Sequence, residues 1–104
     1  MKSYNNYIQE SQDNSGIFSV NIDGENMIFS LKYSDKIYIM LDSEIYQELS
    51  VNIPASKFLE ESEFFLNPDV DKRIVDVLID ENFIEKTDME SIAGDKKTYS
   101  YTIV

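Results

Sequence analysis

The fold of this chain is decided by the stretch Ile17–Tyr33, which reads IFSVNIDGENMIFSLKY. Hydrophobic side chains recur at alternate positions on both sides of the dipeptide Asp23-Gly24. This alternation is typical of strands that bury one face, and an Asp-Gly pair between two such runs is a strong signal for a tight turn. The stretch therefore predicts an antiparallel hairpin.

Two further hydrophobic segments extend this hairpin into a meander. Residues 36–41 read KIYIML and are almost continuously apolar, which is typical of a central strand. Residues 46–53 continue the pattern as far as Pro54, which has no N–H to contribute to a ladder of strands. Polar pairs at residues 34–35 and 42–43 supply the turns between them. The first half of the chain thus predicts four antiparallel strands.

The second half contains one strong helix signal. Hydrophobic residues spaced as a single helical stripe occur at Val70, Ile74, Val77 and Leu78. Asn67 or Asp69 is expected to cap the start of this helix, and Asn82 is expected to end it.

Shorter elements flank the helix. Residues 56–61 predict a helical turn and residues 63–66 a short strand, while residues 83–87 and 98–104 predict two closing strands joined by an acidic loop through residues 94–95. Tyr99 and Tyr101 alternate with polar residues, so they are expected on one face of the last strand, where core or edge packing would account for them.

Together these patterns predict a single α+β domain over residues 16–104. One main helix packs across an antiparallel sheet of about five or six strands. Residues 1–15 are polar and aperiodic and are expected to form a flexible N-terminal segment. The hydrophobic pattern predicts a core of Ile22, Phe29, Leu31, Ile37, Ile39, Leu41, Val51, Ile53, Phe65, Ile74, Val77 and Leu78.

Missing residue types exclude several classes of function. The 104 residues contain no cysteine and no histidine, which rules out zinc fingers, iron–sulfur clusters and histidine-based catalytic triads. Glycine-rich phosphate-binding motifs are absent. Asp69 and Asp71 form a D-x-D pattern that could bind Mg²⁺ or Ca²⁺, but acids that open a helix have an ordinary capping role. We therefore expect no enzymatic activity, no cofactor and no metal.

Carboxylates dominate the surface chemistry. Twenty acidic residues against nine basic residues give a net charge of −11. Residues 60–95 hold twelve of the acids and three of the bases, a net charge of −9, so the rest of the chain carries only −2. Such a chain repels nucleic acids and anionic membranes and attracts basic protein surfaces, although the same charge can serve solubility alone.

The acidic segment supplies the candidate partner-binding residues. Carboxylates at positions i and i+4 of a helix lie about 6 Å apart along its axis. This spacing is similar to that of phosphates along a nucleic-acid strand, so the carboxylates could occupy a basic groove that holds DNA or RNA. The candidates are Glu60, Glu61, Asp69, Asp76, Asp80, Glu81, Glu85, Asp88 and Glu90.

Hydropathy argues against a membrane location. The first residues lack the apolar run of a signal peptide, and no run of about 18 apolar residues occurs in the chain. We expect a cytoplasmic protein, with monomer and homodimer both left open.

Four motifs resemble a family of small, uncharacterised acidic proteins carried by bacterial phages, plasmids and conjugative elements. They are LSVNIP at residues 49–54, EFFL at 63–66, a helix ending near NFI at 82–84, and YSY at 99–101. The resemblance covers roughly residues 27–104, but Asn82-Phe83 stands where members often have Gly-Ile, and a Thr-Gly turn after Thr87 is missing. It implies a mobile-element context, in which small acidic proteins often inhibit host defence, for example as anti-CRISPR proteins.

Charge and resemblance together predict a non-enzymatic anti-CRISPR inhibitor from a mobile genetic element. Its acidic surface would mimic nucleic acid and block the basic channel of a Cas effector nuclease, with a Cas9-type effector favoured. It would act in the cytoplasm of the bacterial host cell, without binding nucleic acid or membrane directly. One alternative is an accessory protein of the mobile element that binds another basic host factor. A second alternative is a carboxylate-dependent metal enzyme.

Overall fold

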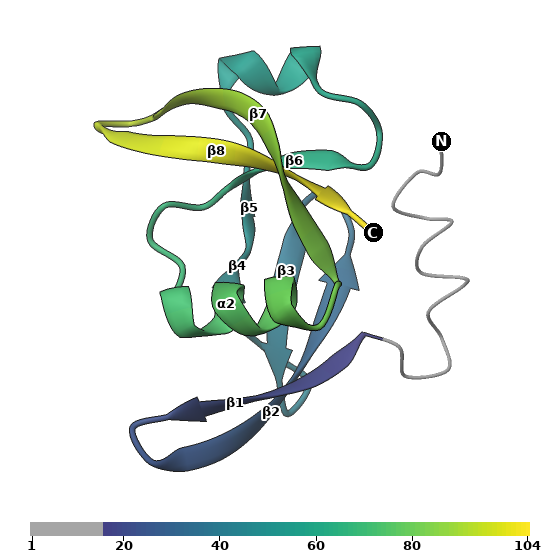
Figure 1. The fold of residues 1–104 in the computed structure, drawn as a ribbon, viewed down its shortest axis with the longest axis vertical. Coiled ribbons are helices and arrows are strands. Elements are labelled where there is room, and N and C mark those ends of the chain that lie inside the picture. Colours follow the sequence, from purple (N-terminus) through teal and green to yellow (C-terminus); the bar gives the residue numbers. More distant parts are fainter. Residues whose placement is uncertain (1–15) are drawn as a thin grey trace.

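Eight strands and two helices follow one another along residues 16–104, the part of the chain that the computed structural model describes (Figure 1). Their order is β1 (Ile17–Ile22), β2 (Glu25–Tyr33), β3 (Ile37–Leu41), β4 (Glu44–Glu48), β5 (Ser50–Val51), the 3₁₀ helix η1 (Pro54–Phe58), β6 (Glu63–Leu66), α2 (Lys72–Asp80), β7 (Ile84–Ala93) and β8 (Lys96–Ile103). Neither helix in this range has the length and apolarity needed to cross a membrane. The flexible segment expected at residues 1–15 lies outside the described residues.

The N-terminal meander is confirmed. Strands β1 to β4 pair antiparallel in chain order, and Phe18 lies opposite Phe29 in the first hairpin. Asp23 and Gly24 both have positive φ angles, 53° and 86°, as a two-residue turn that matches the twist of its strands requires. The side chain of Asn21 accepts a hydrogen bond from the Gly24 amide at 2.9 Å, which stabilises this turn.

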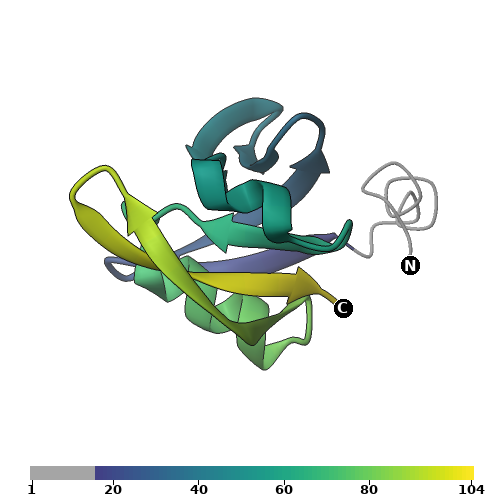
Figure 2. The same cartoon turned by 90° about the horizontal axis from the view of Figure 1, so that it is seen from above.

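The fold is α+β, but its strands form two sheets of four instead of one sheet of five or six. The second sheet has the order β5-β6-β8-β7, and all its neighbours are antiparallel. The fourth predicted strand, residues 46–53, does not continue to Ile53, because β4 ends at Glu48 and β5 belongs to the second sheet. Figure 2 shows the curled, blue-to-teal part of the meander on the opposite side of the molecule from the β7–β8 hairpin.

Hydrogen bonds at Leu49 and Ser50 explain why the chain changes sheet there. The amide of Leu49 donates to the carbonyl of Ile37 in β3 at 2.8 Å, while the carbonyl of Leu49 accepts from Asn67 at 2.8 Å. The Ser50 hydroxyl accepts from the Ile37 amide at 2.9 Å. Leu49 and Ser50 are both buried, and buried polar groups need hydrogen-bond partners. These hydrogen bonds supply partners at the point where the chain passes from one sheet to the other.

Helix α2 begins at a different cap from the two that the sequence predicted. Asp71, not Asn67 or Asp69, is the N-cap, and its carboxylate accepts from the Arg73 amide at 2.9 Å. Asn82 ends the helix as predicted, with a positive φ of 62°. The Phe83 amide donates to the Leu78 carbonyl at 2.9 Å, which closes the C-terminus in a Schellman motif.

Strand β7 is longer than the predicted strand at residues 83–87. It runs to Ala93 and meets β8 across a turn at Gly94, where the φ is 68°. The register shifts between Lys86 and Glu90, and this bulge is held by Ser100, whose hydroxyl accepts from the Met89 amide at 3.2 Å and bonds the Thr87 hydroxyl. The later part of this strand was not predicted, because its charged residues have low strand propensity and a bulge interrupts its pairing.

One cluster of buried side chains draws on both sheets and on α2. Of the predicted core, Phe29, Ile37, Ile39, Phe65, Ile74 and Leu78 are fully buried. The others are only partly buried, because several lie at strand ends or on the short edge strand β5: Ile22, Leu31, Leu41, Val51, Ile53 and Val77. Val70, which the predicted helical stripe included, is buried just before α2 begins. The prediction missed further buried residues, namely Phe18, Val20, Tyr33, Leu49, Phe64, Val75, Ile84, Tyr101 and Ile103.

Candidate functional site

All nine predicted partner-binding acids are exposed. They come from three places in the fold: the connection between η1 and β6, the helix α2 with its two flanks, and strand β7. In chain order they are Glu60, Glu61, Asp69, Asp76, Asp80, Glu81, Glu85, Asp88 and Glu90. The structure therefore presents the acidic segment to solvent over several elements.

Two of these nine carboxylates have basic partners within residues 16–104. Asp69 pairs with Lys96, and Glu90 lies 3.8 Å from Lys97. Both lysines come from β8, directly after the acidic segment of residues 60–95. The remaining seven carboxylates make no ion pair with any described residue. Their charge is available to a partner.

The charges on α2 run opposite to those that favour a helix. Lys72 and Arg73 occupy its first turn, whereas Asp80 ends its last turn and Glu81 is the C-cap. A helix has a partial positive charge at its N-terminus and a partial negative charge at its C-terminus, so each misplaced charge costs about 0.3–1 kcal/mol. Helix stability therefore does not explain Asp80 and Glu81.

Asp71 and Arg73 connect the start of α2 to the meander. The Asp71 carboxylate accepts from Arg73 Nε at 3.0 Å and Nη2 at 2.7 Å, while Arg73 Nη1 donates to Asp23 in the β1–β2 turn at 3.0 Å. The guanidinium hydrogen bonds hold the pKa of Asp71 below its ordinary value, and the two carboxylates raise the pKa of Arg73. This acid has a structural role.

The two acids of the D-x-D pattern, Asp69 and Asp71, have separate structural roles. Asp69 pairs with Lys96, and Asp71 caps α2 and binds Arg73. Within residues 16–104, no three acidic, histidine or cysteine side chains gather closely enough to hold a metal ion.

The fold brings together a group of lysines that no local sequence pattern predicted. Four of the eight basic residues in the described part of the chain line one hollow between α2 and the β7–β8 hairpin: Lys72, Lys86, Lys96 and Lys97. Tyr99 and Tyr101 line it too and share one face of β8, as predicted. The lysines are scattered along the sequence, and only the return of β8 towards the helix unites them.

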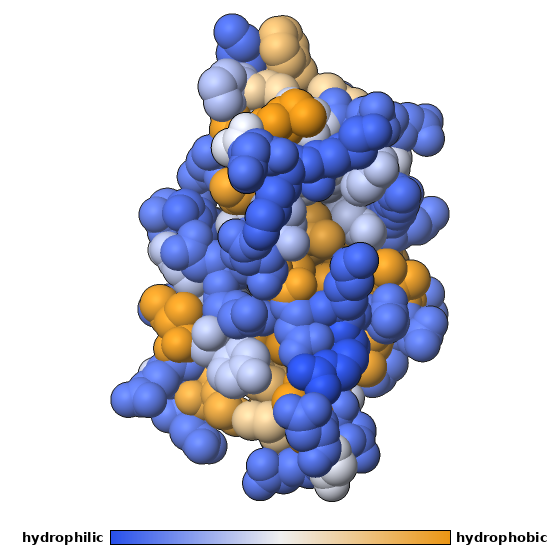
Figure 3. Space-filling model, turned by 90° about the vertical axis from the view of Figure 1, so that its left-hand side faces the viewer, coloured by the Kyte–Doolittle hydropathy of each residue, from blue (hydrophilic) through white to orange (hydrophobic). Residues whose placement is uncertain are grey.

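Figure 3 shows one side of the molecule, which is mostly hydrophilic with separated apolar patches. This surface differs from the contiguous apolar face that an obligate protein interface would present. Comparisons of the chain with protein-family models, with curated proteins and with solved structures found no match.

Proposed function

We propose that this protein is a non-enzymatic binding protein whose acidic surface docks on a basic surface of another protein. The observation that supports this is the set of seven exposed carboxylates without an ion pair in residues 16–104, of which Asp80 and Glu81 oppose the dipole of α2. Proteins often retain residues that lower stability when those residues serve function, and binding to a partner would be such a function for Asp80 and Glu81.

The narrower form of this proposal is an anti-CRISPR inhibitor that occupies the nucleic-acid channel of a Cas effector, with a Cas9-type effector as the first target to test. These channels are basic and hold the nucleic-acid backbone by its charge and shape. Exposed carboxylates on α2 and β7 would compete with phosphates for the same lysines and arginines. The mobile-element context implied by the family resemblance leads to this choice of target.

A pair of matched variants tests whether the acids of α2 matter by position or only by charge. Asp80→Lys/Glu81→Lys and Glu25→Lys/Glu44→Lys each change the net charge from −11 to −7. All four residues are exposed and lie outside the ion pairs of the described residues. We expect the first variant to weaken binding to the basic partner at least about tenfold, and the second by less than about threefold, because docking needs local complementarity.

The measurement is the affinity for the effector, with and without guide RNA, at fixed ionic strength, together with inhibition of DNA cleavage. The variant Asp80→Lys/Glu81→Lys should be at least as stable as the wild type, because it corrects the charges at the helix end. Loss of binding then cannot come from unfolding. Equal weakening by both variants, or tight binding of the protein itself to DNA or RNA in a gel shift, would contradict the proposal. If the protein bound only a different basic host protein, the proposed role of the acidic surface would stand, but the Cas effector would be rejected as its target.

A further inference from the structure

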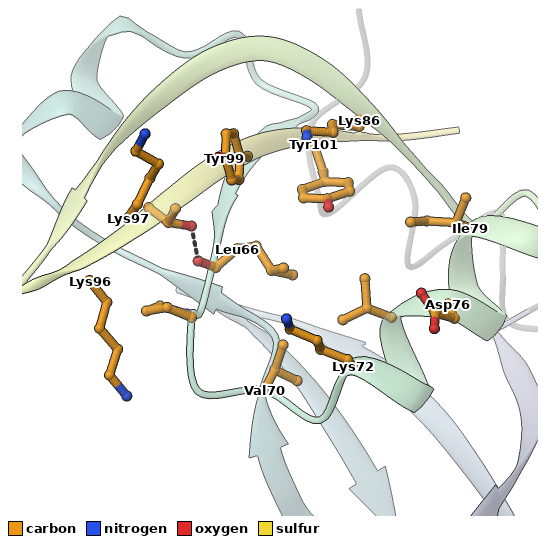
Figure 4. Close-up of a pocket in the computed structure, with 13 residues that line it drawn as sticks. Leu66, Val70, Lys72, Asp76, Ile79, Lys86, Lys96, Lys97, Tyr99 and Tyr101 are labelled. Atoms are coloured by element: carbon orange, nitrogen blue, oxygen red, sulfur yellow. Dashed lines mark hydrogen bonds between the residues drawn. The ribbon is translucent and has the colours of Figure 1, made fainter.

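The hollow between α2 and the β7–β8 hairpin has the size and lining of a small-molecule site. Its volume is about 410 Å³, and small-molecule sites commonly occupy about 300–1,000 Å³. Aliphatic side chains form much of its wall, among them Leu66, Val70, Val75 and Ile79. Figure 4 shows the side chains of Leu66, Val70 and Ile79 facing the open space from β6, the segment before α2 and α2.

Two of the four lysines at this hollow lack a carboxylate partner in residues 16–104. Lys96 and Lys97 are paired with Asp69 and Glu90, whereas no such contact occupies Lys72 or Lys86. In Figure 4 the ammonium group of Lys72 extends from α2 into the hollow, and that of Lys86 lies on the opposite side beside the tyrosine rings. The Lys86 nitrogen is 4.0 Å from the centre of the Tyr99 ring.

Tyr101 adds a hydrogen-bond donor between these two cations. Its side chain is 7% exposed, and its hydroxyl points into the hollow (Figure 4). No hydrogen bond joins this hydroxyl to another of residues 16–104, and its oxygen is not sealed from solvent. Burial, with smaller effects from Asp76 and Tyr99, raises the pKa of Tyr101, so it remains a donor at neutral pH. The hollow thus combines two free ammonium groups, one phenolic donor and an aliphatic wall.

The charge at the hollow selects one class of ligand. Lys72 and Lys86 supply two uncompensated positive charges, and Asp76 on the lining supplies one negative charge. The resulting balance of +1 matches a singly charged anion better than a doubly charged phosphate ester. A positive site in a protein with a net charge of −11 is not explained by solubility.

We propose that this hollow binds a small organic monocarboxylate with an apolar body. The carboxylate accepts hydrogen bonds from Lys72, Lys86 and the Tyr101 hydroxyl, and the body packs on Leu66, Val70 and Ile79. The hollow shares Asp76 with the proposed partner surface, but Asp80 and Glu81, whose substitution tests that surface, do not line it.

Titration with hexanoate, followed by the backbone amide resonances of the full chain, tests this site. Hexanoate should give saturable shifts at Leu66, Val70 and Ile79. Hexanol, which has the same number of carbons and no charge, should bind at least about tenfold more weakly. Hexyl phosphate should bind no more tightly than hexanoate. Lys72→Met and Lys86→Met should each weaken hexanoate binding about tenfold or more, the loss expected for one charge-assisted hydrogen bond.

Lys32→Met is the matched control, because Lys32 is exposed on β2 and does not line the hollow. It should leave hexanoate affinity unchanged, and Tyr101→Phe should weaken it while the spectrum stays folded. The site is rejected if hexanoate gives no saturable shifts or if Lys32→Met weakens binding as much as Lys72→Met. If hexanol bound as tightly as hexanoate, the hollow would be an apolar cleft that does not recognise charge, and the proposal would fail. Tighter binding of hexyl phosphate would overturn the assignment to monocarboxylates.

Discussion

At the scale of single residues, two polar side chains determine where α2 begins and ends. Asp71 accepts the first free amide of the helix and also holds Arg73, which reaches Asp23 in the meander. Asn82 adopts the left-handed conformation that lets Phe83 turn back towards the core. Phe83 then packs on Phe18, with ring centres 5.7 Å apart. Local capping chemistry thus connects the helix to the rest of the fold.

Removing the Asp71 carboxylate should weaken folding in two separable ways. Asp71→Ala loses both the cap and the ion pair and should lower the free energy of unfolding at pH 7 by about 0.5–2 kcal/mol. Asp71→Asn keeps a capping oxygen and loses only the charge, so its loss should stay below about 1 kcal/mol. Urea titrations of the two variants measure this difference, and an equal loss would show that the cap contributes nothing.

The contribution of the Asp71 charge should also depend on pH. Because Arg73 lowers the pKa of this carboxyl in the folded protein, the stabilisation is fully present above its ordinary value of 3.8 and is lost as the pH falls through the lower, folded pKa. The wild type and Asp71→Asn should therefore converge in stability at low pH. Urea titrations across this range test the sign, and a difference that stayed constant would rule out the ion pair as its source.

At the scale of elements, α2 has two distinct faces. Ile74, Val75 and Leu78 are buried against the core, while Asp76, Ile79 and Asp80 are exposed. Strand β7 also protects the edge of its sheet, since its bulge and its charged side chains hinder pairing with another chain. In both elements the polar face carries the acids and the apolar face builds the fold.

The same substitution on the two faces of α2 should have very different effects. Ile74→Ala removes a side chain with no exposed surface and should lower the free energy of unfolding by about 2–5 kcal/mol. Ile79→Ala removes one that is 38% exposed and should cost less than about 1 kcal/mol. Unfolding in urea measures both, and similar losses would mean that another face of the helix meets the sheets.

At the scale of the whole molecule, the net charge of −11 opposes folding, because the compact state brings like charges together. The five ion pairs of the described residues offset this repulsion only in part, since they lie at the surface. The hydrophobic cluster shared by both sheets and α2 provides the opposing stabilisation. The molecule therefore maintains its acidic surface at the expense of stability.

Salt should act on folding and on partner binding in opposite directions. Raising NaCl from about 20 to about 300 mM shortens the screening length and should raise the thermal midpoint of unfolding. The same change should weaken binding to a basic partner, since that binding depends on unscreened attraction. Thermal melts and affinity measurements in the same buffers test both effects, and a midpoint that fell with salt would show that ion pairs outweigh the repulsion.

The sequence by itself determined most elements of the described chain. Alternating hydrophobic residues around Asp23-Gly24 located β1 and β2, and the stripe through Ile74 and Leu78 located α2. These signals are local, because strand alternation and helical spacing follow from backbone geometry alone. The exposure of the nine acids also followed from composition and spacing, since charged side chains remain in water unless a partner compensates their burial.

Only the tertiary structure decided that there are two sheets and that lysines gather beside the helix. The change of sheet at Leu49 depends on hydrogen bonds to Ile37 and Asn67, which are 12 and 18 residues away. The hollow exists because β8 returns Lys96 and Lys97 to the side of Lys72. Contacts between distant residues form when apolar faces pack together, and a local pattern does not specify which faces meet.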